Sequence, residues 1–386
     1  EMELPDTADV VIIGGGVMGV STAYHLASRG CERVVLLERH PFFAAEATGK
    51  CAGGIRYQFS TRINIALSQI SLPMLDRFED EIGQPIDLRQ CGYLFLLTNQ
   101  EDVSAFRGSV ALQHRMGIET EWLDPDEITS RVPLLNMEGV VAGTFHSADG
   151  LADPSGVVQG YVSAARRSGA LLFNGIEVTG ITLVDNQIIG VVTNQGEIAS
   201  PLVVNAAGPW AATVGMMVGV DLPVVPIRRQ IAVTTPIPDI PSGFPFIIDF
   251  AKSLYFHREG PGVLTGMSNR DEAAGFDQSV DERWESVHLE SAMQRLPVLA
   301  EAGIASRWAG LYEVTPDAHP ILGRVPEIEG FLVICGFSGH GFQHGPACGM
   351  LMAEEILDGG AHSLDIAPLD LSRFAEGRSI DEYHVV

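Results

Sequence analysis

Residues 9–39 read DVVIIGGGVMGVSTAYHLASRGCERVVLLER, and this stretch decides the fold. The apolar run at 10–13 is typical of a short strand buried on both faces, and the run at 34–38 repeats that pattern. Between them, apolar residues recur at helical spacing from Val20 to Ala27, and Gly30 is a suitable helix stop. The stretch therefore predicts a strand, a helix and a second, parallel strand.

The glycines at the first turn indicate what this unit binds. Gly14, Gly16 and Gly19 follow the first strand and open the helix. In this pattern the first glycine makes the tight turn, the second lets the backbone approach a pyrophosphate, and the third lets helix and strand pack closely. Glu38 ends the second strand, where a carboxylate can accept hydrogen bonds from ribose hydroxyls. We therefore predict a dinucleotide site, the alternative being a glycine-rich turn in an unrelated α/β protein.

Composition limits the remaining possibilities. The chain has 386 residues, enough for about two to three domains, and 46% of them are hydrophobic. The formal net charge of −25 argues against nucleic acid or an anionic membrane surface as a partner. Five cysteines, odd in number and without a C-x-x-C pair, favour neither a zinc site nor a disulfide framework. We expect no metal, no membrane span, no secretory signal and a cytoplasmic location.

The rest of the chain is predicted to contain both helices and strands. Apolar spacing predicts helices at 61–82, 101–117, 281–296 and about 346–357, and a further helix that starts at Asp153-Pro154-Ser155. Strands are expected at 91–97, 188–193, 200–206 and 330–335, and antiparallel strands at 229–235, 253–257 and 262–266. We see no internal repeat.

Four blocks carry a family resemblance. They are 10–39, 47–56, 203–210 and 308–349, the last containing GLYEVTPDAHPILG at 310–323 and GFSGHGF at 336–342. Together they resemble the D-amino-acid oxidase family of flavoenzymes, which includes glycine oxidase, sarcosine oxidase and the β subunits of sarcosine oxidase and L-proline dehydrogenase. The resemblance implies an α/β fold, with a Rossmann-like FAD-binding domain and an inserted antiparallel-sheet substrate domain. We expect the FAD-binding domain at 1–85, 140–222 and 305–386, and the substrate domain at 86–139 and 223–304.

The resemblance also implies the cofactor contacts. FAD is expected without a covalent bond, because Gly310 stands where monomeric sarcosine oxidase has a flavin-linking cysteine. The 336–341 loop is expected to present backbone N–H groups to the pyrimidine side of the flavin. The residues assigned to FAD are Gly14, Gly16, Val17, Met18, Gly19, Glu38, Arg39, Thr48, Gly49, Val178, Ala207, Gly208, Trp210, Gly310, Gly336, Gly339, His340, Gly341, Phe342 and Gln343.

For the substrate carboxylate, the resemblance favours Arg56. Its position often forms a salt bridge with a carboxylate in the family, and a guanidinium suits bidentate binding. The alternative is a surface or cofactor-phosphate arginine. Tyr312 and Gln343 stand where relatives carry cationic anchors, so glycine or sarcosine itself is not favoured as substrate. No histidine stands near 153–155, so attachment of a second flavin there, as in the sarcosine oxidase β subunit, is not expected.

Four further residues are candidates for a catalytic role. Tyr255 and His257 lie on a predicted strand of the substrate sheet and could face the flavin or point away from it. His340 could lie beside the flavin or cap a helix, and Lys252 could assist reaction with oxygen or be an exposed lysine. With Arg56 and Tyr312, the residues Tyr255, His257 and His340 form the expected catalytic set.

The expected reaction is oxidation of the C–N bond of a secondary or primary amino acid, N-substituted glycine-like, glycine- or sarcosine-like, or proline-like. It would give an imine by hydride transfer to flavin N5, followed by hydrolysis and formation of H2O2. Alternatives are a dehydrogenase subunit that passes electrons to a partner, a non-catalytic FAD-binding assembly factor and a nicotinamide-dependent dehydrogenase. The electron acceptor, O2 or a redox partner subunit, stays open, as does a homo- or hetero-oligomeric state.

Overall fold

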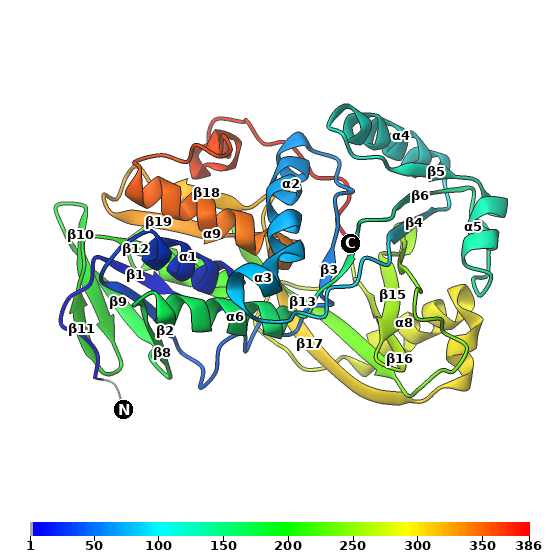
Figure 1. Ribbon diagram of the computed structural model, residues 1–386, viewed down its shortest axis with the longest axis horizontal. Coiled ribbons are helices and arrows are strands. Elements are labelled where there is room, and N and C mark those ends of the chain that lie inside the picture. The colour runs from blue at the N-terminus through cyan, green and yellow to red at the C-terminus, as the bar shows by residue number, and fades with distance from the viewer. Residues whose placement is uncertain (1–2) are drawn as a thin grey trace.

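The structure is a computed structural model that describes residues 3–386 (Figure 1). It contains two large sheets. The first has the strand order β18-β19-β12-β1-β2-β8. Its strands are β1 (Val10–Ile13), β2 (Val34–Glu38), β8 (Leu171–Asn174), β12 (Val203–Asn205), β18 (Ile321–Arg324) and β19 (Phe331–Cys335). All neighbours in this sheet are parallel except β18, which runs antiparallel to β19.

Alternating side chains of this sheet enter two separate cores. Ile12 and Leu36 pack with the helices on one face, whereas Val11 and Val35 pack on the other. The first face is covered by α1 (Val17–Ser28), α6 (Pro154–Arg167) and α9 (Gly341–Leu357), which lie side by side (Figure 1). The opposite face carries a small antiparallel sheet of β9 (Val178–Val184), β10 (Gln187–Thr193) and β11 (Gly196–Ala199). The domain thus has three layers, with helices on one face of the mainly parallel sheet, as in a Rossmann-like fold, and a small antiparallel sheet in place of helices on the other.

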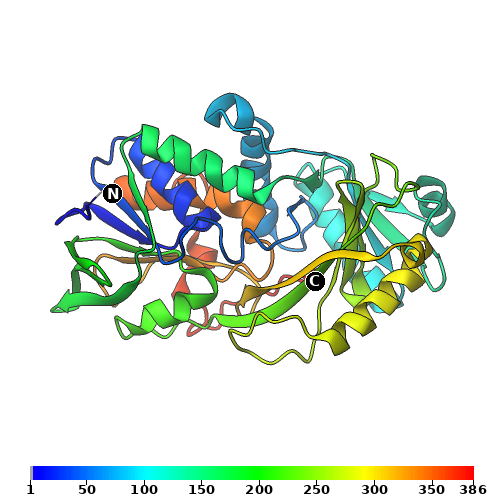
Figure 2. The same ribbon diagram turned by 90° about the horizontal axis from the view of Figure 1, so that it is seen from below.

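The second large sheet has eight strands in the order β17-β13-β16-β15-β14-β4-β6-β5. They are β4 (Tyr93–Leu97), β5 (Glu121–Leu123), β6 (Ala142–His146), β13 (Val225–Thr234), β14 (Phe246–Asp249), β15 (Leu254–Glu259), β16 (Gly262–Met267) and β17 (Ile304–Val314). Figure 2 shows the long strands β13 and β17 side by side, with the helix α8 (Glu282–Arg295) near them. A pair of short strands, β3 (Gly54–Ile55) and β7 (Gly150–Leu151), lies apart from both sheets.

Most expected elements are present. The predicted helix at 61–82 is divided into α2 (Arg62–Asp76) and α3 (Phe78–Ile82), and that at 101–117 is α4 (Gln100–Arg115). The helix α6 begins as predicted, since Asp153 is its N-cap and accepts a hydrogen bond from the Ser155 N–H at 2.9 Å. Short helices complete the chain: α5 (Pro125–Arg131) and α7 (Ala211–Met216). Within residues 3–386, no helix is both long and apolar enough to cross a membrane.

Some expectations need correction. The strands β6 and β17 belong to the eight-stranded sheet, although the predicted boundaries assign 140–222 and 305–386 to the FAD-binding domain. Pairing decides their place: β6 pairs with β4, and β17 pairs with β13 along almost its whole length. The sheet is not wholly antiparallel, because β14 and β4 are parallel. The last helix starts at Gly341 rather than near 346 and continues through Pro346.

Candidate functional site

The turn after β1 brings three backbone segments very close together. A Cβ atom at Gly14 would lie 2.3 Å from the Ala206 carbonyl oxygen, and one at Gly19 would lie 1.9 Å from the Gly14 carbonyl oxygen. Both distances are far below van der Waals contact, so only glycine allows β1, β12 and α1 to approach. A Cβ atom at Gly16 meets no backbone, and its nearest neighbour is the Thr48 hydroxyl oxygen at 3.2 Å. Space at Gly16 is therefore open to a ligand.

Two side chains fix this turn. The buried Glu38 carboxylate accepts hydrogen bonds from the Gly15 N–H at 2.7 Å and the His40 N–H at 2.8 Å. The Thr48 hydroxyl accepts from the Val17 N–H at 3.2 Å, which brings the 40–52 loop to the start of α1. Gly16 is the N-cap of α1 and has no side chain to cap the helix, so apart from the Thr48 hydroxyl the positive end of α1 faces the turn.

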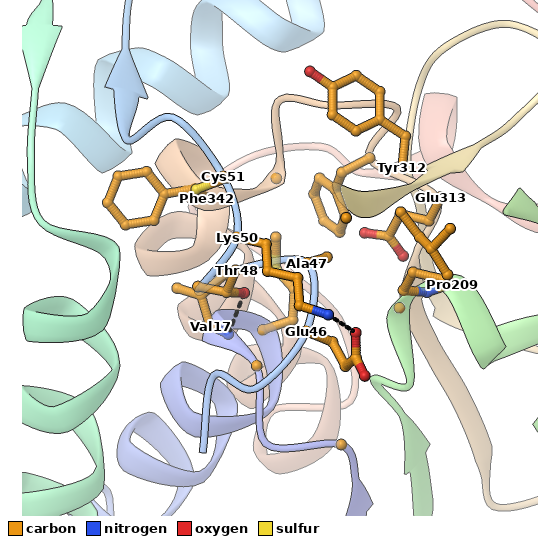
Figure 3. A pocket seen from close by; sticks show the side chains of 18 of the residues that line it. Val17, Glu46, Ala47, Thr48, Lys50, Cys51, Pro209, Tyr312, Glu313 and Phe342 are labelled. Carbon is orange, nitrogen blue, oxygen red and sulfur yellow. Dashed lines mark hydrogen bonds and ion pairs between the residues drawn. The ribbon is translucent and has the colours of Figure 1, made fainter. Parts of the chain in front are cut away.

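A long cavity runs from this turn to the start of α9 (Figure 3). At the turn it is lined by residues that the sequence assigns to the cofactor: Gly14, Gly16, Val17, Met18, Glu38, Arg39, Thr48, Val178, Ala207, Gly208 and Trp210. At the far end the lining includes Gly310, Gly339, His340, Gly341, Phe342 and Gln343. Gly19, Gly49 and Gly336 support the backbone and do not line the cavity. An open glycine turn, a helix N-terminus and an acid at the end of β2 fit an extended dinucleotide.

The adenosine-type end of such a ligand would meet an aromatic and cationic wall. The Arg39 guanidinium lies 3.9 Å from the centre of the Trp210 ring. Trp210 in turn stacks on Phe276, with ring centres 5.4 Å apart. Phe276 comes from the 268–281 loop, so this stack joins the two sheets' domains beside the cavity.

At the far end, the 336–341 loop is held by Glu313, a residue that the sequence analysis did not single out. Its carboxylate accepts from the Gly336 N–H at 2.9 Å, and its backbone carbonyl accepts from the Ser338 N–H at 3.0 Å. Burial raises the pKa of Glu313 to about 7. Figure 3 shows Glu313 and Tyr312 entering from β17, opposite the loop that carries Thr48 and Lys50. The signal that could have revealed Glu313 is an acid within the mainly apolar second half of its strand, 308–314.

Arg56 lies at this end but is strongly engaged by the protein. Its guanidinium donates to the backbone carbonyls of Gln58 and His384 and lies 3.9 Å from the centre of the Phe59 ring. The Gln343 side-chain amide pairs with both backbone groups of Arg56, at 3.0 Å each. Arg56 is 7% exposed. It lines the cavity, but two of its N–H groups and the Gln343 amide are already bonded within the fold.

His340 occupies the N-cap position of α9, yet its imidazole does not cap the helix. Nε2 lies 2.9 Å from the Ala318 carbonyl oxygen, and Nδ1 lies 3.2 Å from Nδ1 of His344. Burial lowers the pKa of His340 to about 4, so the ring is neutral at pH 7. The imidazole borders the cavity as an uncharged group whose two nitrogens are hydrogen-bonded.

Three tyrosines surround the far end of the cavity. Tyr255 and Tyr312 were expected there, and Tyr93 from β4 joins them. A Cβ atom at Gly339 would lie 2.3 Å from the Tyr312 ring, so the glycine lets this ring pack against the loop. Burial raises the pKa of all three phenols, which therefore remain protonated hydrogen-bond donors. The run 93–97 is apolar at every position, so no alternation in the sequence indicates the face on which Tyr93 lies.

Two candidates lie elsewhere. His257 is on β15 with Tyr255 but does not line the cavity, and its Nδ1 lies 2.9 Å from the Arg258 carbonyl oxygen. Lys252 is exposed and also absent from the cavity wall. The lysine that does line the cavity is Lys50, which packs against Gly310 and pairs with Glu46 at 2.8 Å. Lys50 lies in the block 47–56 that carries the family resemblance, and its sequence pattern indicated no role for it.

Arg229 is a further lining residue that the sequence analysis missed. It lies on β13 directly opposite Gly310 of β17. The signal was an arginine within the alternating apolar positions Ile227, Ile231 and Val233, a pattern that places a cation on the inner face of a strand.

Comparison with known proteins gives a consistent result. A family model described as "FAD dependent oxidoreductase" matches residues 9–355. Human mitochondrial sarcosine dehydrogenase is 32% identical over 390 residues, which cover 96% of this chain and 42% of that protein. The chain thus spans less than half the length of this curated relative.

Solved structures are similar over the whole chain. L-Proline dehydrogenase from P. horikoshii superimposes with a TM-score of 0.90 at 33% identity, covering 97% of this chain and 99% of that one. Glycine oxidase from Geobacillus kaustophilus superimposes with a TM-score of 0.86 at 25% identity, covering 96% and 99% of the two chains.

Proposed function

Because the chain belongs to the family of FAD-dependent oxidoreductases, we propose that it oxidises the C–N bond of an amino acid to an imine. The substrate is a secondary or primary amino acid of the N-substituted glycine, glycine/sarcosine or proline type. This proposal draws on the similar proteins, which are named for sarcosine, proline and glycine. Water then hydrolyses the imine to a carbonyl compound and an amine or ammonia.

The observation that carries the proposal is the composition of the cavity's far end. Tyr93, Tyr255 and Tyr312 stand there with two arginines, Arg56 and Arg229, in a protein of net charge −25. A local cluster of cations suits an anionic ligand, and aromatic walls suit its apolar part. An α-amino acid, which presents a carboxylate beside its amine, meets the requirements of such a site.

When FAD is bound, its flavin N5 accepts the hydride that leaves the substrate carbon. Gly14, Gly16 and the start of α1 would hold the pyrophosphate, and Glu38 the ribose. We propose that FAD is held without a covalent bond. Gly310 offers no side chain, and burial raises the pKa of Cys51, which lines the cavity, to about 11, so that its thiol stays protonated.

The protein side chains at the far end favour a neutral substrate amine. His340 is uncharged at pH 7 and the phenols are protonated, and the Glu313 carboxylate, with a pKa of about 7, accepts from the Gly336 N–H. None of these groups is a strong base. A neutral amine uses its own nitrogen lone pair to expel the hydride, and its N–H proton is then lost to water. The tyrosines and the arginine side of the cavity therefore bind and orient the amino acid, with Arg56 held within the fold, and the 336–341 loop supports the cofactor.

A product analysis tests this proposal. The FAD-loaded protein is incubated with amino acids of the three types and an artificial electron-accepting dye, and carbonyl products are trapped with a hydrazine reagent. We expect one carbonyl product for each pair of electrons that the dye receives. A dye that stays oxidised with every amino acid would contradict catalysis and favour the non-catalytic alternative.

A parallel assay in air separates two versions of the enzyme. Formation of H2O2 by the isolated chain would identify an oxidase. Turnover that depends on the dye would favour a dehydrogenase that passes electrons to a partner protein.

A further inference from the structure

Arg229 has a position that sets it apart from its neighbours on β13. It lines the long cavity and also a second, adjoining cavity that is bordered by Asp102, Ser268 and Tyr383. Tyr312 lines both cavities as well. Arg229 therefore stands on the wall where the two spaces meet, next to the aromatic end of the long cavity.

The Arg229 guanidinium is incompletely bonded by the protein. Nη1 donates to the Arg228 carbonyl oxygen at 2.9 Å, whereas the buried Nε has no hydrogen-bond partner. Its Cζ atom lies 5.2 Å from the centre of the Tyr312 ring. No carboxylate in residues 3–386 forms an ion pair with it. A buried N–H without a partner is costly, so this group is suited to an incoming acceptor.

The guanidinium groups of the other arginines near the site are more fully bonded by the protein. Arg56 donates to two backbone carbonyls and lies against Phe59. Arg228, the preceding residue, pairs with Glu272 and Asp277, both at 2.9 Å. Since successive residues of a strand point to opposite faces, Arg228 and Arg229 face different surroundings despite being adjacent.

We propose that Arg229 binds the carboxylate of the substrate, with Nε and the free Nη2 donating to the two carboxylate oxygens. This inference rests on the proposed function and names the residue that recognises the substrate class. The nearby phenols of Tyr255 and Tyr312 supply further donors to the same carboxylate. The second cavity then leaves room for substituents larger than those of glycine.

The test uses two ligands, pyrrole-2-carboxylate and pyrrole-2-carboxamide, which differ only in the carboxylate. Neither is an aliphatic amine, so neither is expected to be oxidised. Each is titrated into FAD-loaded wild type and the variants Arg229→Gln, Arg229→Lys and Arg228→Gln, by calorimetry and by the change in flavin absorbance. The Arg228→Gln variant is the control, because it removes a guanidinium from the neighbouring position outside the cavity.

We expect wild type to bind the carboxylate more tightly than the carboxamide. Arg229→Gln should weaken the carboxylate at least about tenfold, as expected for lost charge-assisted hydrogen bonds, and change the carboxamide less than about twofold. Arg229→Lys should restore part of the loss, since an ammonium lacks the guanidinium fork. Arg228→Gln should leave the preference for the carboxylate intact.

Three results would overturn the inference. They are wild type that does not prefer the carboxylate, Arg229→Gln that retains this preference, and Arg229→Gln that is purified without flavin. The last would assign Arg229 to the cofactor. Failure of the proposed function is a separate observation, because it requires that no amino acid is oxidised by wild type.

Discussion

Glu313 shows how a single residue can give this protein a pH response. The burial that raises its pKa to about 7 acts on a carboxyl whose ordinary value is 4.5. The folded chain therefore holds this proton more tightly than the unfolded chain. The contribution to stability is complete below pH 4.5 and is lost as the pH rises through 7.

Glu313→Gln should remove this pH-dependent loss of stability while keeping an acceptor for the Gly336 N–H. From pH 5 to pH 8, the free energy of unfolding of the variant should rise relative to wild type by about 1–3 kcal/mol. Denaturant titrations of both holoproteins across that range measure the difference. A difference that does not change with pH would mean that Glu313 does not titrate there.

Arg56 is expected to act chiefly in stability. Arg56→Ala removes the donors of two backbone carbonyls and the contact with Phe59, and should lower the free energy of unfolding by about 2–4 kcal/mol. Arg229→Gln, which removes one bonded N–H, should cost less than about 1 kcal/mol by the same measurement. If Arg56→Ala is as stable as wild type and loses amino-acid affinity, the carboxylate anchor is Arg56, as the sequence resemblance suggested.

The sequence predicted which residues lie at the site better than it predicted the role of each residue. Gly14, Gly16 and Glu38 follow a local pattern, so their positions could be read directly. The state of Arg56 could not, because its partners include the carbonyl of His384, far along the chain. Arg229 and Glu313 depend likewise on which strands become neighbours.

At the scale of elements, the βαβ unit separates folding from binding. Gly14 and Gly16 are two residues apart, yet a Cβ atom at Gly14 would collide with the Ala206 carbonyl, whereas the nearest neighbour of one at Gly16 is the Thr48 hydroxyl oxygen at 3.2 Å. Gly14 is thus required by the fold, whereas the fold leaves Gly16 available for the proposed contact with the cofactor.

Gly16→Val should therefore fold but lose FAD, because the added side chain occupies the approach of the pyrophosphate to the backbone. Gly14→Val should fail to fold. The flavin-to-protein ratio and the circular dichroism of the two purified variants distinguish these outcomes. Full flavin occupancy in Gly16→Val would mean that the pyrophosphate lies elsewhere.

Local elements were predictable, and their assignment to sheets was less so. The runs at 10–13 and 34–38 are buried on both faces and read clearly as parallel strands. The strands β6 and β17 have ordinary patterns, and only their long-range pairing places them in the eight-stranded sheet. Pro346 misled the prediction of the last helix, since the apolar packing of α9 against α1 holds the helix through it.

At the scale of the whole molecule, the cavity is shared by the two domains. The six-stranded sheet supplies the turn at Gly14, and the eight-stranded sheet supplies Tyr255, Arg229 and Tyr312. In the proposed function, the cofactor lies against the first sheet and the amino acid against the second, and Gly310 of the long strand β17 lines the cavity between them. This division explains why the cofactor was predictable from one segment, whereas the substrate site depends on several.

Anaerobic reduction of the bound flavin tests the central claim most directly. Sarcosine, proline and glycine are each added without oxygen, with the matching acids that lack nitrogen as controls, while flavin absorbance at about 450 nm is followed. We predict that at least one amino acid bleaches the flavin with a stoichiometry near one substrate per FAD, and that the acids do not. Flavin that dithionite reduces but no amino acid bleaches would contradict the account.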